Sequence, residues 1–485
     1  MQRLGSKKEA VVSEFWKDEC GIVGVYGHPE ASNIAYLCMY ALQHRGQESA
    51  GIVASTGRSM YSHRAMGLVQ DVFDENILMK LPGPMAIGHV RYSTSGSSLL
   101  KNAQPFAVES SQGRIAVAHN GNLVNARTLR EHMEESGAIF QSSMDTEVIV
   151  HLMASVKSGR LLDKISIAAN EIRGAFSLVM LTDRQLAACR DPWGLRPLVM
   201  GRINDKAVIF ASETCALDLV GAKYEREVEP GEVIIVDEDG VKSYHPMVAR
   251  KPARCIFEHV YFARPDSIVF GESVYQSRLK LGARLWQEQP AQADVVISVP
   301  DSGRVAAMGY AAAAGLPYQE GLIRNHYVGR TFIEPSHAIR HFGVKVKLNA
   351  VRSVLEGKRV VVVDDSIVRG TTCQKIVHML REMGKAKEVH FRISSPPVTH
   401  PCFYGIDTPT KSELIYNVKD GCLADICHFI TADSLGYVSV QGLNEAVSGC
   451  CDNGYCNACF SGDYPVEVID DLERKQLDLF LREVD

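Results

Sequence analysis

The run from Val360 to Thr372, which reads VVVVDDSIVRGTT, constrains the fold more than any other stretch of the chain. Four consecutive β-branched residues are typical of a short strand buried on both faces, as in a parallel sheet. Asp364 and Asp365 end this strand, and open α/β sheets place their ligands at that end. Residues 373–383 have a helical period. The run therefore predicts a strand, a ligand-binding loop and a helix in direct succession.

The loop between this strand and helix has the groups that bind a phosphorylated sugar. Its hydroxyls, guanidinium and backbone N–H groups at a helix N-terminus come from Ser366, Arg369, Gly370, Thr371 and Thr372. The paired aspartates suit a sugar diol, or a Mg²⁺ held between sugar and phosphate oxygens. Together these features resemble the 5-phosphoribosyl-1-pyrophosphate (PRPP) signature of type I phosphoribosyltransferases. The alternative is a buried strand that ends in an acidic turn.

Length and charge limit the remaining possibilities. A chain of 485 residues exceeds what one hydrophobic core serves, so we expect two or three domains. A net charge of −5 gives no basic field for nucleic acid, and no apolar run reaches the length of a membrane span. Residues 1–19 lack the apolar core of a secretory signal. The 13 cysteines therefore indicate metal or catalytic roles in a reducing cytoplasm.

The first half of the chain is predicted to be a layered α/β sandwich, because its strands are numerous and its helices are gathered in blocks. Strands are predicted at 20–27, 50–54, 85–93, 114–119, 176–182, 207–211 and 232–236, and helices at 30–43, 122–136 and 145–157. Polar patches at predicted strand ends or turns comprise Cys20, 44–48, 89–94, 119–122 and 145–147.

These patches together resemble the αββα glutaminase domain of amidotransferases whose nucleophile is an N-terminal cysteine. The resemblance implies that a leader, residues 1–19, is removed by a cut between Glu19 and Cys20. A free α-amine titrates near pH 7.7–8.0 and can act as the general base for the thiol of its own residue. The same nitrogen within an amide has no basicity. We therefore expect the uncut precursor to be inactive as a glutaminase.

The resemblance also assigns the groups that act on glutamine. Cys20 would attack the side-chain amide, while the amide of Asn120 and the backbone N–H of Gly121 would form the oxyanion hole. Arg91 would pair with the α-carboxylate of the substrate and Asp145 would accept from its α-ammonium. Taken singly, a cysteine at the start of a strand is usually a core residue, and an Asn-Gly pair is usually a hairpin turn. The ordered set favours the enzyme.

Residues 251–254 mark the expected boundary to a second domain, in which strands and helices alternate. Strands are predicted at 294–299, 360–363 and 388–393, and helices at 303–314 and 373–383. This order indicates a right-handed parallel sheet of the phosphoribosyltransferase type. By the same resemblance, Ser302 would lie near Mg²⁺ alongside Asp364 and Asp365.

The basic stretch 324–352 resembles the mobile lid of that family. The lid residues that would reach the pyrophosphate are Arg330, Thr331, Lys345 and Lys347. The alternative for such a stretch is a solvated basic face.

The cysteines of the second half resemble those of iron–sulfur enzymes. A lone C-x₂-C such as Cys456 and Cys459 is compatible with zinc, a redox pair or chance. Together with Cys255 and Cys402 it resembles the subgroup that carries a 4Fe–4S cluster on four thiolates. Structural zinc is the alternative, and the neighbouring Cys450 and Cys451 leave the ligand set open.

The two halves together resemble the glutamine PRPP amidotransferases of purine synthesis. We expect a leader at 1–19, a glutaminase domain at 20–250, a phosphoribosyltransferase domain with the iron–sulfur cysteines at 251–465, and a helical tail at 466–485. Glutamine hydrolysis at Cys20 would release ammonia that displaces pyrophosphate from PRPP, giving 5-phosphoribosylamine. Family members use Mg²⁺, form homotetramers and are inhibited by purine nucleotides.

The sequence also offers candidates for coupling the two reactions, and it leaves alternative functions open. Arg45 and Tyr92 are the candidates for coupling PRPP binding to the glutaminase. A PRPP-sensing regulator, and a stand-alone glutaminase with a vestigial second half, are the alternatives. A sister enzyme that makes glucosamine 6-phosphate would need a sugar-isomerase domain in place of the signature at 360–372.

Overall fold

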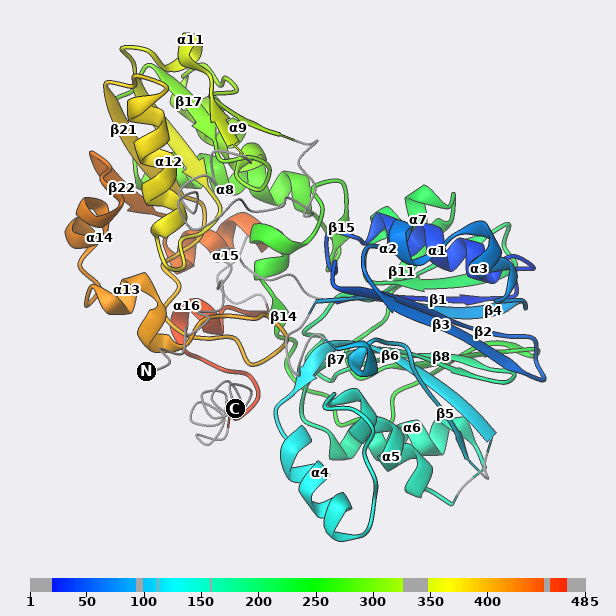
Figure 1. The fold of residues 1–485 in the computed structure, drawn as a ribbon. Helices are drawn as coiled ribbons and strands as arrows, with labels where there is room; N and C mark the ends of the chain where they lie inside the picture. The colour runs from blue at the N-terminus through cyan, green and yellow to red at the C-terminus, as the bar shows by residue number, and fades with distance from the viewer. Residues whose placement is uncertain are drawn as a thin grey trace, which may run out of the picture.

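The structure, a computed structural model, describes residues 20–92, 99–110, 113–157, 159–325, 348–448 and 454–468. The elements from β1 to β13 form one half of the molecule and those from β17 to β22 form the other (Figure 1). The predicted leader and most of the predicted basic lid and tail lie outside the described residues. No helix among the described residues is both long and apolar enough to cross a membrane.

The first half contains two antiparallel sheets that face each other. One has the strand order β11-β9-β10-β1-β4-β2-β3 and the other has the order β13-β12-β8-β7-β6-β5. The first sheet comprises β1 (Gly21–Tyr26), β2 (Ser49–Ser55), β3 (Met60–Met66), β4 (Met85–Arg91), β9 (Val199–Ile203), β10 (Ala207–Ala211) and β11 (Lys223–Glu227). The second comprises β5 (Phe106–Ser110), β6 (Gly113–Leu123), β7 (Gly174–Thr182), β8 (Leu186–Arg190), β12 (Val233–Asp237) and β13 (Gly240–Tyr244).

Helices cover the outer faces of both sheets. Helices α1 (Ala31–Ala41), α2 (Val69–Val72), α3 (Glu75–Met79) and α7 (Thr214–Leu219) cover the first sheet, and α4 (Ala126–Glu135), α5 (Thr146–Ser155) and α6 (Leu161–Glu171) cover the second. Strand β1 is apolar throughout because both of its faces are buried. Val23 and Val25 pack beneath the helices, whereas Ile22 packs against the second sheet. The predicted αββα sandwich is confirmed.

The second half is built on a parallel sheet with the order β17-β20-β21-β22. Its strands are β17 (Val295–Ser298), β20 (Arg359–Asp364), β21 (Glu388–Ile393) and β22 (Ser434–Tyr437). Helices α8 (Val274–Glu288), α9 (Arg304–Ala314) and α15 (Val440–Ser448) pack on one face, and α12 (Thr371–Glu382) and α14 (Leu423–Ile430) pack on the other.

The four valines of β20 explain the predicted signature. Val361 and Val363 belong to the core under α8 and α9, whereas Val360 and Val362 belong to the core under α12. Because successive side chains of a strand point to opposite faces, burial on both faces requires an unbroken apolar run.

Short elements complete both halves and the connection between them. They are the 3₁₀ turns η1 (Leu100–Asn102) and η4 (Lys411–Glu413), the π-helix η2 (Glu258–Phe262), and helices α11 (Arg352–Leu355), α13 (Ile415–Val418) and α16 (Ala458–Ser461). The short strand pairs are β14 (Arg254–Cys255) with β23 (Tyr455–Cys456), β15 (Ile268–Val269) with β16 (Glu272–Ser273), and β18 (Leu322–Arg324) with β19 (Leu348–Ala350).

The first half differs from the prediction at the Asn120-Gly121 pair. The sequence predicted that this pair lies at a strand end or in a turn, but it lies inside β6, which continues to Leu123. The reason is the pairing of β6 with β7, which runs without interruption from Ile115 opposite Thr182 to Leu123 opposite Gly174. Helix α4 consequently begins only at Ala126, four residues after the predicted start of a helix at 122.

Candidate active sites

Cys20 lies immediately before β1, and its thiol is buried against the end of the neighbouring strand β4. The Sγ of Cys20 donates to the carbonyl oxygen of Tyr92, 3.7 Å away. Burial raises the pKa of this thiol to about 11. The hydrogen bond to Tyr92 and the positive charge of Arg91 lower the pKa, whereas the negative charges of Asp145 and Glu48 raise it further. The thiol is therefore protonated at neutral pH and needs a base, the role that a free α-amine on Cys20 would fill.

The pair Asn120-Gly121 presents hydrogen-bond donors on β6. None of the described residues bonds the buried Nδ2 of Asn120, although buried amides are normally satisfied. Gly121 has a φ of +146°, and a Cβ at this position would overlap the carbonyl oxygen of Ala175. Only glycine fits here without strain. The sequence predicted these two residues as the oxyanion hole, and the free amide is suited to receive an oxygen from a substrate.

Asp145 forms the N-cap of α5 and is held by groups that flank the Asn-Gly pair on β6. Its Oδ2 accepts from the backbone N–H of Leu123 at 3.0 Å, and its Oδ1 lies 3.5 Å from Nδ1 of His119. Burial acts to raise the pKa of Asp145, but His119 and the backbone donors outweigh burial and hold that pKa below its usual value. The carboxylate is thus an anion that can accept from an ammonium group.

Arg91 ends β4 opposite Ser49 of β2 and is buried. The charges of Arg91 and Asp145 both act on the thiol of Cys20. The structure therefore brings a buried thiol, a guanidinium and a carboxylate into one region. This is the set needed to bind and attack an amino acid amide.

Arg45 forms two buried ion pairs, one of which links this region to the second half of the molecule. Its guanidinium pairs with Glu213 of the first half and with Glu258 of η2. The Nε2 of His44 lies 2.7 Å from the same Glu213. Burial acts to raise the pKa of Glu213, but Arg45 and His44 outweigh it and lower that pKa. The sequence predicted Arg45 as a coupling residue but gave no signal for Glu213 or Glu258, since neither belongs to a motif.

The turn that follows Arg45 packs on the strand that carries Arg91. A Cβ on Gly46 would lie 2.6 Å from the backbone N of Arg91, and the N–H of Glu48 donates to the carbonyl oxygen of Arg91 at 3.0 Å. Arg45 therefore contacts the second half, while its own turn packs on the end of β4, which carries Arg91. Tyr92, the other predicted coupling residue, contributes the carbonyl that accepts from Cys20.

The second candidate site lies at the carboxyl end of β20, as predicted. The backbone N–H of Asp365 donates to Oδ1 of Asp364 at 2.9 Å, and the hydroxyl of Ser366 donates to Asp365. Burial and the charge of Asp365 raise the pKa of Asp364. Burial also raises the pKa of Asp365, which a hydrogen bond from Ser302 opposes. Ser302 is thus brought to the aspartate pair, and a divalent cation would relieve the crowding of these two carboxyl groups.

The loop between β20 and α12 has the form predicted for a phosphate site. Gly370 has a φ of +78° and precedes the first turn of α12, where the buried hydroxyl of Thr371 has no partner among the described residues. Arg369 instead pairs with Glu413 at 2.9 Å. Thr372 lies in the same first turn. The predicted lid residues Arg330, Thr331, Lys345 and Lys347 lie outside the described part of the chain.

Arg278 of α8 is a buried cation near this site that the sequence did not reveal. It donates to the carbonyl oxygens of His259, Tyr261 and Ala263 at 2.8 to 2.9 Å. Its charge also acts to lower the pKa of Asp365. Arg278 therefore holds η2, whose first residue is the Glu258 that pairs with Arg45.

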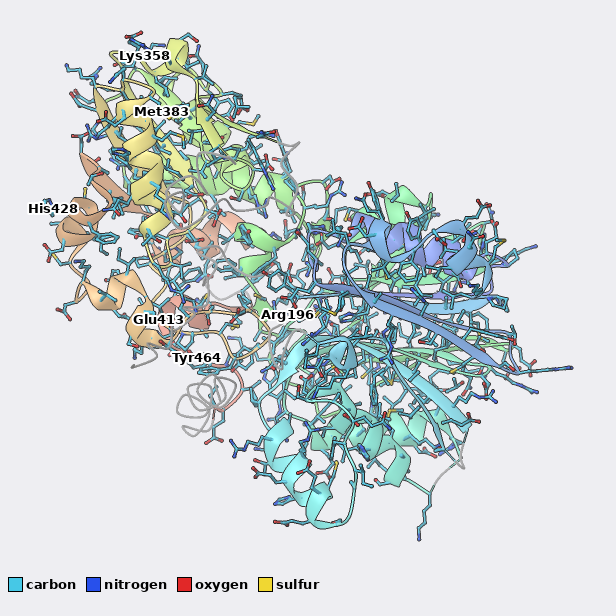
Figure 2. All side chains as sticks on the ribbon, in the orientation of Figure 1. Arg196, Lys358, Met383, Glu413, His428 and Tyr464 are labelled. Carbon is cyan, nitrogen blue, oxygen red and sulfur yellow. The ribbon has the colours of Figure 1, made fainter. Side chains whose placement is uncertain are left out.

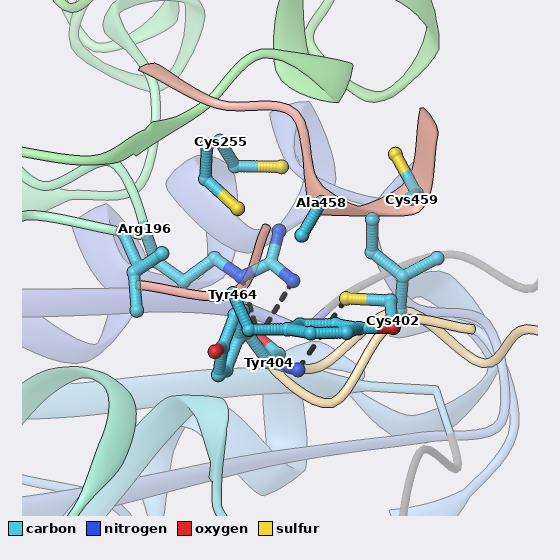
Figure 3. Close-up of a pocket in the computed structure, with 10 residues that line it drawn as sticks. Arg196, Cys255, Cys402, Tyr404, Ala458, Cys459 and Tyr464 are labelled. Carbon is cyan, nitrogen blue, oxygen red and sulfur yellow. Dashed lines mark hydrogen bonds between the residues drawn. The ribbon is translucent and has the colours of Figure 1, made fainter. Parts of the chain in front are cut away.

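The cysteines predicted as metal ligands line one buried pocket between the two halves (Figure 3). Strands β14 and β23 pair in parallel with Cys255 opposite Cys456. Cys459 follows in α16, and Cys402 comes from the loop 401–406. The pocket is completed by Leu195, Arg196, Tyr404, Ile406, Ala458 and Tyr464. Cys450 and Cys451 lie outside the described residues.

The electrostatics of this pocket disfavour free thiolates. Burial raises the pKa of Cys255 to about 11, Arg196 lowers it, and Glu258 and Cys402 raise it further. Burial and the neighbouring thiols also raise the pKa values of Cys456 and Cys459. The backbone N–H of Tyr404 donates to Sγ of Cys402 at 3.3 Å. Such thiols are suited to bind a metal centre that displaces their protons.

Comparisons with known proteins agree with both halves. A family profile described as a glutamine amidotransferase domain matches residues 89–219. Amidophosphoribosyltransferase 1, chloroplastic, of Arabidopsis thaliana is 58% identical over 452 residues, which cover 93% of this chain and 79% of that protein. The amidophosphoribosyltransferase of Bacillus subtilis is 50% identical over 458 residues, 94% of this chain and 95% of that one.

Two solved structures match the whole fold. One, described as the allosteric regulatory enzyme of purine biosynthesis, has a TM-score of 0.89 and 50% identity, and covers 93% of this chain and 97% of that chain. The other is glutamine PRPP amidotransferase from Bacillus subtilis in complex with ADP and GMP. It has a TM-score of 0.88 and 49% identity, with coverages of 93% and 98%.

Proposed function

This chain belongs to the amidophosphoribosyltransferase family, the glutamine PRPP amidotransferases of purine biosynthesis, and we propose that it hydrolyses glutamine at Cys20 and transfers the ammonia to PRPP at Asp364 and Asp365. The observation that carries the assignment of sites is the set of buried ion pairs of Arg45, which joins the half containing Cys20 to the half containing the aspartates. Family membership decides against a PRPP-sensing regulator and a stand-alone glutaminase.

In the glutaminase reaction, the α-amine of Cys20 takes the thiol proton and the sulfur attacks the amide carbon of glutamine. Negative charge develops on the amide oxygen and is stabilised by Asn120 Nδ2 and the N–H of Gly121. The C–N bond then breaks, and the proton returns to the nitrogen, which leaves as ammonia. Water hydrolyses the thioester to give glutamate and restore the thiol. Arg91 and Asp145 hold the α-carboxylate and α-ammonium of the substrate.

In the second reaction, ammonia forms a bond to C1 of PRPP as the bond to pyrophosphate breaks, giving 5-phosphoribosylamine. The hydroxyl of Thr371 and the first turn of α12 receive the 5-phosphate, together with Ser366, Arg369, Gly370 and Thr372. The crowded carboxyl groups of Asp364 and Asp365, with Ser302, would hold a Mg²⁺ ion, and the ion would neutralise charge on the leaving pyrophosphate. The lid residues Arg330, Thr331, Lys345 and Lys347 are proposed to bind the pyrophosphate on closure.

The four-cysteine pocket is proposed to hold a 4Fe–4S cluster rather than zinc. Tetrahedral zinc holds thiolates about 2.3 Å from one ion, so that the sulfurs lie roughly 3.8 Å apart. Among the described residues, only Glu229, Glu232 and His245 place three ligand atoms within 4.8 Å of one another. No three of the described thiols of Cys255, Cys402, Cys456 and Cys459 lie that close to one another, which favours the larger cluster.

The Cys402→Ser variant tests this centre. We expect anaerobically purified variant protein to lose most of its iron, its acid-labile sulfide and its visible absorbance, because one of four thiolate ligands is gone. The matched control is Cys422→Ser, which changes an exposed cysteine outside the pocket and should keep the iron content of the unchanged protein. Stoichiometric zinc and no sulfide in the unchanged protein would contradict the cluster.

The Asn120→Ala variant tests the oxyanion hole. We expect kcat for glutamine hydrolysis to fall by about 10²- to 10³-fold with little change in KM, because the lost donor stabilises charge that develops only in the transition state. Synthesis from added ammonia should be unaffected. The measurement is steady-state release of glutamate in the presence of PRPP. A change confined to KM would instead make Asn120 a substrate-binding group.

We propose a division of the chain that places each reaction in its own domain. We assign a leader to 1–19, the glutaminase domain to 20–250, the phosphoribosyltransferase domain to 251–465 and a tail to 466–485. Arg45 and Tyr92 are proposed to couple the reactions, since the carbonyl of Tyr92 accepts from Cys20 and Arg45 pairs with Glu258 of the second half. A homotetramer, inhibition by purine nucleotides and a cytoplasmic location stay predictions, and plant relatives are named as chloroplastic.

Transfer of ammonia is tested with glutamine labelled with ¹⁵N in its side-chain amide. The labelled substrate, PRPP and Mg²⁺ are mixed in a buffer that contains excess unlabelled ammonium. We expect the product amine to retain the ¹⁵N, because ammonia passes within the protein. Product amine with the isotope content of the buffer would show that the two reactions are linked only through solvent.

A further inference from the structure

The loop that carries Cys402 packs directly on the strand of the proposed oxyanion hole. A Cβ on Gly405 would lie 3.1 Å from the carbonyl carbon of Gly121, a tight contact, and the φ of +111° at Gly405 would strain any other residue. Next to this contact, Nδ2 of Asn122 donates to the carbonyl oxygen of Phe403 at 2.9 Å. Strand β6 of the first half and the loop 401–406 of the second half therefore touch at the residue whose N–H receives the oxyanion.

Arg196 holds the same loop from the other side (Figures 2 and 3). It is buried where the two halves meet, and its Nε and Nη2 donate to the carbonyl oxygen of Tyr404 at 2.9 and 2.6 Å. The carbonyl oxygen of Arg196 accepts from Ser177 at 3.1 Å, and Ser177 lies opposite Asn120 across β6 and β7. Arg196 thus reaches the cysteine loop with its side chain and the oxyanion strands with its backbone.

Arg196 also faces the thiols. It lines the pocket of the four cysteines, and its Nη1 lies 3.7 Å from Oε1 of Glu258. A buried guanidinium favours the anionic form of neighbouring sulfurs, and a centre bound by four thiolates brings negative charge into this pocket. The charge and the loop geometry of the pocket therefore depend on one residue that belongs to the first half.

We infer that Asn122 and Arg196 are positioning residues through which the cysteine centre fixes the oxyanion hole of the glutaminase. When the centre is bound, Cys402 anchors the loop 401–406, and the loop holds Gly121 through Gly405 and Asn122. The N–H of Gly121 must lie within a few tenths of an ångström of its place to stabilise the oxyanion. This inference rests on the proposed function, because it takes Cys402 as a ligand and Gly121 as an oxyanion donor.

The Asn122→Ala variant tests the link, because it removes the tether to Phe403 without touching substrate or metal ligands. We expect iron, sulfide and visible absorbance to be unchanged, and kcat for glutamine hydrolysis to fall roughly tenfold with KM for glutamine unchanged. Alkylation of Cys20 by a diazoketone analogue of glutamine, which uses the oxyanion hole, should slow to the same extent. Alkylation by iodoacetamide, which does not use the hole, should keep its rate.

Asn125→Ala is the matched control. The side chain of Asn125 ties the end of β6 to its own half, donating to the carbonyl oxygen of Glu171 at 2.9 Å and accepting from the N–H of Arg173 at 2.9 Å. This variant should keep the diazoketone rate. Equal diazoketone rates for Asn122→Ala and Asn125→Ala would overturn the inference. If the unchanged protein still makes 5-phosphoribosylamine from ammonia, such a result would overturn only the role of Asn122. Loss of that synthesis would overturn the proposed function itself.

Arg196 is tested with Arg196→Lys and Arg196→Met. Both variants lose the paired bonds to Tyr404, but only the methionine variant loses the charge. We expect the visible absorbance to bleach in air several-fold faster in Arg196→Met than in Arg196→Lys, and the diazoketone rate to fall in both variants. Bleaching and diazoketone rates equal to those of the unchanged protein in both variants would overturn the role of Arg196.

Discussion

The Cys20→Ala variant is expected to lose glutamine-dependent synthesis of 5-phosphoribosylamine by about 10⁴-fold or more, while synthesis from added ammonia continues. In the proposed glutaminase reaction the sulfur of Cys20 forms the thioester. The methyl group of alanine cannot replace it. Ammonia made outside the protein needs only the second site. The measurement is pyrophosphate release with glutamine and, separately, with ammonium as the nitrogen donor.

Cys38→Ala is the control for this variant. Cys38 is also a buried thiol of the first half, but it donates only to the carbonyl oxygen of Ala216 in the core beneath α1. Its replacement should reduce stability slightly and leave both nitrogen donors in use. Retention of glutamine-dependent synthesis by Cys20→Ala would contradict the account of the first site.

The pH dependence of the first reaction follows from the same geometry. Burial raises the pKa of the Cys20 thiol to about 11, so the thiol stays protonated across the physiological range and does not itself set the activity. The proposed base is the α-amine of Cys20, which is effective only in its neutral form above its pKa near 7.7–8.0. We therefore expect kcat/KM for glutamine to fall as the pH drops through that range. A profile that rises only near the pKa of the thiol would indicate a different base.

The Asp364→Asn and Asp365→Asn variants are expected to lose synthesis from both nitrogen donors, each by about 10²- to 10³-fold, because the metal supplies several kcal/mol of stabilisation to the leaving pyrophosphate. Their glutaminase activity without PRPP should persist. Asp294→Asn is the matched control, since Asp294 lies at the opposite edge of the same sheet and pairs with Arg359 at 2.8 Å. Loss of glutamine-dependent synthesis alone would contradict the assignment of the pair.

The pH dependence of PRPP binding should follow the same pair. Burial raises the pKa values of both Asp364 and Asp365, and the charge of Asp365 raises that of Asp364 further, so the free pair keeps a proton at pH values where an exposed aspartate is ionised. Binding of Mg²⁺ with PRPP must displace that proton. The apparent affinity should therefore rise with pH until the pair is fully ionised. An affinity independent of pH would show that the pair is ionised before the metal binds.

The sequence predicted those elements whose hydrophobic pattern matches the way in which their side chains are buried. The valines of 360–363 specify a strand with two buried faces, and the hydroxyls and glycine that follow specify a helix N-terminus for phosphate. Asp365 and Ser302 meet because β17 and β20 are parallel neighbours, which the alternation of strands and helices predicted. In these cases short-range pattern and sheet topology are sufficient.

The remaining features depend on contacts between residues that are distant in sequence. The pairing of Arg45 with Glu258, and that of Cys255 with Cys456, are set only when the two halves and their short strands assemble. The Asn120-Gly121 pair was predicted at a strand end or in a turn, because local preference ignores the uninterrupted pairing of β6 with β7. Arg196 belongs to no motif, and its role is visible only from the pocket it lines.

The central claim is that one chain couples glutamine hydrolysis at Cys20 to ammonia transfer at the aspartate pair. The most direct test measures glutamate release and pyrophosphate release simultaneously with anaerobically purified protein. Glutamine is supplied with Mg²⁺, first without PRPP and then with it. We predict that PRPP strongly stimulates glutamate release and that the two products then appear mole for mole. Glutamate release indifferent to PRPP, or pyrophosphate release unmatched by glutamate, would contradict the claim.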